Sequence, residues 1–178
     1  MRFILAFAAF ATAAQAEIVG ESVSLDLDKD GTAETFWLEN NGDGTVNLRA
    51  RDTGYGDFTV EDIAWIGGPG QIPILGQTPA GSLTVTAMNI GIGRNRWESM
   101  ITIAYRRDRY RVVGLSYGFY DSLDLDSNGT CDLNLLTGRG VVVENEVQRD
   151  ITAPIPALPV FAWTERMPIF EFCFGRDD

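Results

Sequence analysis

Histidine is absent from this chain of 178 residues, and cysteine occurs only twice. Without histidine no Ser-His-Asp triad can form, so the G-x-S-x-G match at residues 114–118 (GLSYG) is not a nucleophile elbow. Two cysteines without histidine also cannot supply the three or four ligands of a usual zinc site. The enzyme class that this composition leaves open is that of the glycoside hydrolases, which need just two carboxylates beside a groove.

Basic residues are scarce. The chain has 14 lysines and arginines against 25 aspartates and glutamates, which gives a formal net charge of −11. Its single lysine, Lys29, lies inside an acidic stretch. A surface this acidic repels nucleic acid phosphates and attracts cations. We therefore expect no nucleic acid partner.

No hydrophobic run reaches the length of about 20 residues that a membrane span needs. The main apolar run occupies residues 3–13, follows Arg2 and leads into the small-residue exit Ala-Gln-Ala at residues 14–16. This pattern predicts a cleaved signal peptide at residues 1–16. The remaining residues, 17–178, suit a single domain without membrane insertion.

Export implies a periplasmic or secreted protein in an oxidising compartment, where paired cysteines are the expected state. Cys131 and Cys173 are the only two thiols. We therefore expect a disulfide between them.

No convincing amphipathic helix of ten or more residues is visible, and apolar residues alternate with polar ones nearly everywhere. Turn clusters rich in glycine, asparagine and aspartate separate these segments. The pattern predicts an all-β fold, an antiparallel sandwich or a partial propeller-like assembly of about nine strands. The expected strands are residues 18–27, 33–39, 44–51, 57–66, 82–91, 97–105, 109–119, 131–136 and 140–148, with the pair 97–105 and 109–119 as a hairpin.

Three prolines interrupt the C-terminal part of the chain at Pro154, Pro156 and Pro159. They remove backbone donors, so this segment is expected to be extended and to lie outside any central strand. A short helical turn is expected near residues 160–164. Phenylalanines at every second position of residues 169–174 predict a final strand.

Alternating carboxylates precede a glycine in residues 25–38 (LDLDKDGTAETFWL), directly ahead of an apolar strand. Calcium takes about six to eight oxygen ligands, and aspartates at the first, third and fifth positions of a loop can point at one centre. Gly31 permits the sharp turn, and Trp37 stands where an EF-hand needs its twelfth-position carboxylate, which excludes an EF-hand. The candidate calcium ligands are Asp26, Asp28, Asp30, the backbone carbonyl of Thr32, and Glu34.

A near copy follows in residues 123–136 (LDLDSNGTCDLNLL). Its residues 128–130 also form a glycosylation sequon, and a glycan there would block metal binding. For both loops the alternative is an ordinary turn, because turns prefer aspartate, asparagine and glycine. The candidate ligands of the second loop are Asp124, Asp126, Asn128 and Asp132.

The first loop resembles the calcium loop of FG-GAP and VCBS-type repeats, which form β-propeller blades. The residues that carry this resemblance are Asp26, Asp28, Asp30, Gly31 and Glu34. The resemblance implies bound Ca²⁺, although the Phe-Gly and Gly-Ala-Pro landmarks are absent and the two copies lie further apart than one blade. Separately, RYRVVGL at residues 109–115 with NLLTG at 134–138 is similar to a pattern in uncharacterised exported bacterial proteins, which implies no activity.

These patterns together predict an exported, calcium-stabilised β module that is not an enzyme and that binds an unidentified protein or glycan. The alternative is a carboxylate-based glycoside hydrolase or a glycan-binding protein. That alternative needs exposed tryptophans to stack on sugar rings. All four tryptophans lie in segments with a core-like pattern, namely Trp37, Trp65, Trp97 and Trp163.

Overall fold

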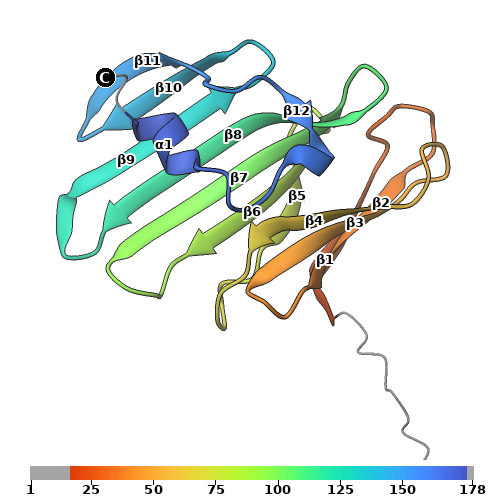
Figure 1. Ribbon diagram of the computed structural model, residues 1–178, viewed down its shortest axis with the longest axis horizontal. Helices are drawn as coiled ribbons and strands as arrows, with labels where there is room; N and C mark the ends of the chain where they lie inside the picture. Colours follow the sequence, from red (N-terminus) through yellow and green to blue (C-terminus); the bar gives the residue numbers. More distant parts are fainter. Residues whose placement is uncertain (1–16, 176–178) are drawn as a thin grey trace, which may run out of the picture.

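The computed structural model describes residues 17–175 as two antiparallel β-sheets (Figure 1). The predicted all-β class is confirmed, and the two sheets form a sandwich-like arrangement. The described residues contain twelve strands, where the alternation of the sequence predicted about nine. The predicted signal peptide at residues 1–16 lies outside the described residues.

The smaller sheet has the strand order β1-β2-β3-β4, in which each strand pairs with the next along the chain. All three pairings are antiparallel, and β-bulges interrupt the β1–β2 and β3–β4 ladders. The strands are β1 (Glu17–Leu25), β2 (Glu34–Asn40), β3 (Thr45–Arg51) and β4 (Phe58–Trp65).

The larger sheet has the order β11-β10-β9-β8-β7-β6-β5, and β12 pairs with the start of β8. The predicted hairpin of two long strands is confirmed as β7 and β8, whose turn contains Arg107 and Asp108 with positive φ. The strands are β5 (Ile74–Gln77), β6 (Leu83–Asn89), β7 (Asn95–Tyr105), β8 (Tyr110–Asp121), β9 (Asp124–Asn134), β10 (Arg139–Glu144), β11 (Val147–Thr152) and β12 (Leu158–Pro159).

One hydrophobic core joins the two sheets. Along β2, Glu34, Phe36 and Leu38 are buried while Thr35 and Trp37 are partly exposed, as the period of two in a strand requires. Leu83 in β6 and Ile103 in β7 belong to the same buried cluster. The alternation read from the sequence therefore corresponds to the inward faces of two sheets packed against each other.

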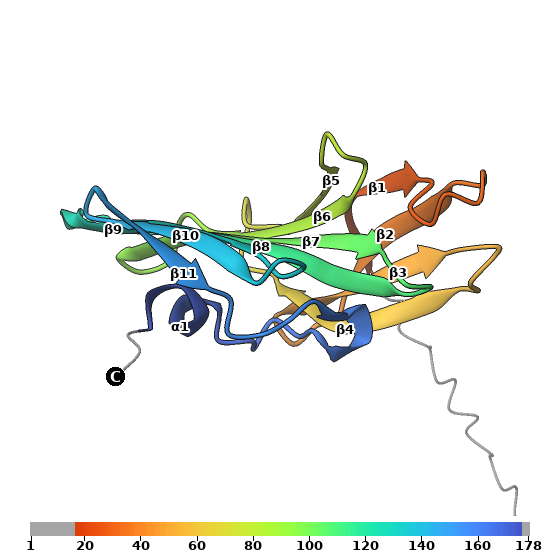
Figure 2. The ribbon, with the colours of Figure 1, turned by 90° about the horizontal axis from the view of Figure 1, so that it is seen from above.

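After β11 the chain runs back along one face of the larger sheet, on the side where β4 lies (Figure 2). This segment contains a 3₁₀ turn, η1 (Val160–Ala162), and a short helix, α1 (Ile169–Phe174). The 3₁₀ turn confirms the predicted helical turn, and Trp163 directly after it is fully buried. No helix within residues 17–175 has the length and hydrophobicity that crossing a membrane requires.

The prediction of a final strand is wrong, because residues 169–174 form α1. Phe170 and Phe174 are four residues apart and therefore lie on one helix face, where their ring centroids are 5.4 and 4.9 Å from that of Phe119 in β8. A strand pattern with phenylalanine at every second position also contains a pair four positions apart, which is the spacing of one helix face. A run of six residues therefore fits a helix and a strand equally well.

The predicted disulfide is confirmed. Cys131 in β9 and Cys173 in α1 are bonded, with their Cα atoms 5.7 Å apart. Both residues are almost fully buried. The bond fixes the C-terminal helix to the larger sheet.

The expected single strand at residues 140–148 is a hairpin instead. Its strands, β10 and β11, are joined by a two-residue turn at Asn145 and Glu146, both with positive φ. Such a turn matches the right-handed twist of the flanking strands. Glutamate is not typical of this backbone conformation, so the turn has only a weak sequence signal.

Candidate metal centre

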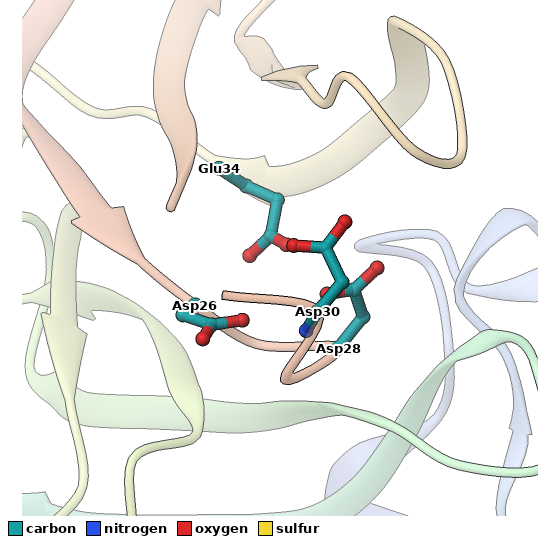
Figure 3. Close-up of side chains that lie close together, drawn as sticks. All are labelled: Asp26, Asp28, Asp30 and Glu34. Atoms are coloured by element: carbon teal, nitrogen blue, oxygen red, sulfur yellow. The ribbon is translucent and has the colours of Figure 1, made fainter. Parts of the chain in front are cut away.

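Four acidic side chains meet in the loop between β1 and β2. Each of the four offers one carboxylate oxygen such that all these atoms lie within 4.8 Å of one another. Figure 3 shows the carboxylates turned toward a common space. These four side chains are Asp26, Asp28, Asp30 and Glu34, the carboxylates predicted for the first calcium loop.

The loop holds its shape through backbone amides that donate to these same carboxylates. The amide of Asp30 donates to Asp28 Oδ1 at 3.0 Å, and the amide of Thr32 donates to Asp30 Oδ1 at 2.7 Å. Asp26 Oδ2 accepts from the amide of Gly31 at 3.2 Å, and Gly31 has φ of +94°, which favours glycine. These hydrogen bonds curve the loop around the space that the four carboxylates face.

Glu34 is the buried member of the group. It begins β2 and is only 2% exposed, and its Oε2 accepts from the amide of Leu27 at 2.6 Å. Burial raises the pKa of Glu34, and the negative charges of Asp28 and Asp52 act in the same direction. No ion pair among residues 17–175 involves any of the four carboxylates. The charge of this buried group is therefore not balanced by a basic side chain of the described protein.

A second loop, between β3 and β4, approaches the same carboxylates. Asp52 is 4% exposed, and its Oδ1 accepts from the amides of Gly54 and Tyr55, each at 2.8 Å. A Cβ atom on Gly54 would lie 3.0 Å from Asp30 Oδ2 and 3.7 Å from Asp28 Oδ2. A side chain at position 54 would crowd the Asp30 carboxylate, so glycine favours this close approach of the two loops.

The larger sheet reaches the site through Tyr110, the first residue of β8. Its hydroxyl donates to Asp52 Oδ2, and Tyr110 is almost fully buried. Burial raises the pKa of Tyr110, as does its hydrogen bond to Asp52. The hydroxyl therefore stays protonated and acts as the donor. Sequence reasoning missed Asp52, Gly54 and Tyr110, and the only hint was the turn-like run DTGYGD at residues 52–57.

The second predicted loop does not form. Asp124, Asp126, Asn128 and Asp132 all lie within β9, whose ladder with β8 is irregular between Asp124 and Asn128 and regular from Asn128 onward. Asn128 donates to the carbonyl of Leu125 at 2.7 Å, and Asp132 accepts from the Ser116 hydroxyl at 3.3 Å. Within residues 17–175 these acidic side chains do not converge as those of the first loop do. The prediction of a converging loop is wrong here, because Asp132 pairs with Ser116 in β8 and with Val141 in β10 and is therefore held in the regular part of the sheet.

The donor set of the first loop consists of oxygen atoms alone. Hard cations such as Ca²⁺ prefer carboxylate and carbonyl oxygens, whereas zinc and copper sites usually contain nitrogen or sulfur. Thr32 is exposed in the same turn, and its backbone carbonyl stays a predicted ligand. A strand follows the loop, as in the sequence prediction, and not the helix of an EF-hand.

Comparison with protein-family models, with curated proteins and with solved structures gives no match for this chain. The resemblance of the first loop to FG-GAP and VCBS-type calcium loops therefore stays a prediction.

Proposed function

We propose that this protein is an exported β-sandwich module that is stabilised by Ca²⁺ and that binds a protein or glycan partner without catalysing a reaction. The observation that carries the calcium part of this proposal is the convergence of Asp26, Asp28, Asp30 and Glu34 within 4.8 Å. The absence of histidine from the sequence supports a role outside triad chemistry.

Electrostatic repulsion explains why a cation is expected at this point. Two like charges 4 Å apart repel by about 4 kcal/mol at an effective dielectric constant of 20. The exposed Asp26 and Asp30 can turn into water to relieve this repulsion, but Glu34 is buried and tied to the amide of Leu27. A divalent cation removes the repulsion and supplies the buried carboxylate with its missing opposite charge.

The position of the site explains how an ion stabilises the whole fold. The first loop joins β1 to β2, and Asp52 and Gly54 bring the β3–β4 loop against it. Through the hydrogen bond from Tyr110 to Asp52, the same cluster contacts the larger sheet. An ion bound by Asp28 and Glu34 therefore holds together parts of both sheets.

We expect Ca²⁺ to raise the melting temperature and the substitution Asp28→Ala to abolish that rise. Extracellular modules bind calcium with dissociation constants of about 10⁻⁴ to 10⁻³ M, so EDTA should remove the ion readily. Calcium at 100 times the dissociation constant adds about 2.7 kcal/mol to the free energy of unfolding. Thermal unfolding in millimolar calcium and in EDTA measures this difference.

Asp126→Ala is the matched control, since it removes the corresponding aspartate of the near copy in β9. This variant should keep the full calcium-dependent rise. In EDTA the Asp28→Ala variant should melt no lower than the wild type, because it also relieves repulsion. If the wild type melts at the same temperature in calcium and in EDTA, the first loop is an ordinary turn and the calcium proposal fails.

A further inference from the structure

An aromatic pocket lies between β4, the middle strands of the larger sheet and the segment after η1. Its volume is about 250 Å³. Trp65 and Trp97 line it and are only partly buried, whereas the sequence predicted that all four tryptophans belong to the core. Trp163 is fully buried, as predicted, and forms part of the wall.

The aromatic side chains form a continuous wall. The ring centroids of Trp65 and Trp97 are 5.4 Å apart, those of Trp97 and Tyr117 are 6.4 Å apart, and those of Tyr117 and Phe170 are 6.2 Å apart. The four rings come from β4, β7, β8 and α1 in turn. A molecule in the pocket therefore contacts several aromatic rings at once.

The wall is preformed. A Cβ atom on Gly67 would clash with the indole of Trp65, so glycine lets the indole pack closely against the following loop. The disulfide of Cys173 fixes the helix that carries Phe170. A pocket whose walls are already held in place loses less conformational entropy when a ligand binds.

The charged side chains that line this pocket are acidic. Glu165 and Glu171 line it, and within residues 17–175 no arginine or lysine does. Arg166 lies 3.5 Å from Glu165 but is itself 80% exposed. Glu171 lines the same pocket as Tyr117, and its negative charge, after burial, helps to raise the pKa of the Tyr117 hydroxyl.

We propose that this pocket binds a small organic cation, with an ammonium group against the Trp97 and Tyr117 rings and beside Glu171. Cations are attracted to aromatic faces and to carboxylates, and the acidic chain as a whole favours them. A neutral sugar is usually held by several directed hydrogen bonds, and the described lining has no arginine, asparagine or glutamine to make them beside the hydroxyls of Ser99 and Tyr117. The proposal stands independently of calcium binding.

Isothermal titration calorimetry with choline and with its uncharged isostere dimethylbutanol, in which carbon replaces the nitrogen, tests this proposal at constant ionic strength. Choline should bind in the millimolar range or tighter. Loss of the cation–π attraction should weaken the binding of the isostere by about 5- to 30-fold. The titrations are made in saturating calcium and again in EDTA, so that a failed calcium proposal leaves this test intact.

Variants locate the site. Glu171→Gln removes an exposed carboxylate of the lining, and Trp97→Leu removes a π face while keeping apolar bulk; both should weaken choline binding several-fold. Glu98→Gln is the matched control, because Glu98 neighbours Trp97 in β7 but does not line the pocket, and it should bind choline like the wild type.

Three results would overturn the proposal. Equal affinity for choline and dimethylbutanol would show an apolar pocket without cation selectivity. Binding of glucose but not of choline would show a sugar site. Choline binding that Glu171→Gln and Trp97→Leu leave unchanged, in variants that melt like the wild type, would place the ligand elsewhere.

Discussion

Replacing both cysteines by alanine is expected to lower the free energy of unfolding by about 4 kcal/mol. The disulfide between Cys131 and Cys173 closes a loop with a sequence separation of 42 residues, and a crosslink of this length restricts the unfolded chain by about that amount in the chain-entropy model. Urea denaturation of the oxidised wild type and of the double variant measures the difference.

The structure indicates which part of the double alanine variant should unfold first. A helix of six residues is not stable alone in water, so α1 depends on the disulfide and on the packing of Phe170 and Phe174 against Phe119. Limited proteolysis should therefore cut the double variant after η1 before it cuts either sheet. The calcium-dependent rise in melting temperature should persist, because the disulfide joins α1 to β9, whereas the candidate calcium ligands lie at the loop between β1 and β2.

Reduced wild-type protein is the matched control, since it lacks the bond but keeps both side chains. Its free energy of unfolding in urea should agree with that of the double alanine variant to within about 1 kcal/mol. A double variant as stable as the oxidised wild type would mean that the bond restricts little of the unfolded chain.

Local sequence signals predicted well those features that neighbouring residues determine. The β7–β8 hairpin follows from two alternating runs around the short polar turn at residues 106–109. The acidic loop converges because Asp26, Asp28 and Asp30 hydrogen-bond to amides only two to five residues away. Such contacts depend on little beyond the local chain, so the sequence contains the information for them.

Local sequence patterns gave wrong predictions where tertiary contacts determine the structure. The near copy of the acidic loop has similar local residues, but these lie in β9, where Asp124 pairs with Asp121 and Asp132 pairs with Ser116 of β8. The alternation at residues 169–174 fits two periods, and packing against Phe119 selects the helix. Trp65 and Trp97 alternate like core residues, yet they line a pocket. In each of these cases the observed structure depends on contacts in the assembled sheets, which the local sequence pattern does not encode.

Asp52 illustrates the limit most clearly, because its partner Tyr110 is 58 residues away in the sequence. No spacing or motif connects the two residues. They meet because the β3–β4 loop of the smaller sheet packs against the start of β8, and this packing also brings Asp52 next to the predicted carboxylates. The buried hydrogen bond thus links the metal centre to the larger sheet.

Removing the Tyr110 hydroxyl is therefore expected to destabilise the protein. Tyr110→Phe leaves a buried carboxylate oxygen of Asp52 without its donor, which should cost about 1.5–3 kcal/mol. Tyr110→Ala also removes a buried ring that packs against Phe36 and Phe58, so it should cost about 3–5 kcal/mol. Urea denaturation in saturating calcium measures both changes.

Asp52→Asn separates the hydrogen bond from the packing of the ring. If the hydroxyl and the carboxylate stabilise each other directly, the double variant Tyr110→Phe/Asp52→Asn should be destabilised by less than the sum of the two single variants. Phe36→Leu serves as the control partner, because Phe36 contacts the Tyr110 ring but not its hydroxyl. Its effect should add to that of Tyr110→Phe. Strict additivity of Tyr110→Phe and Asp52→Asn would contradict the link, and the two sheets would then be held together at this end by apolar packing alone.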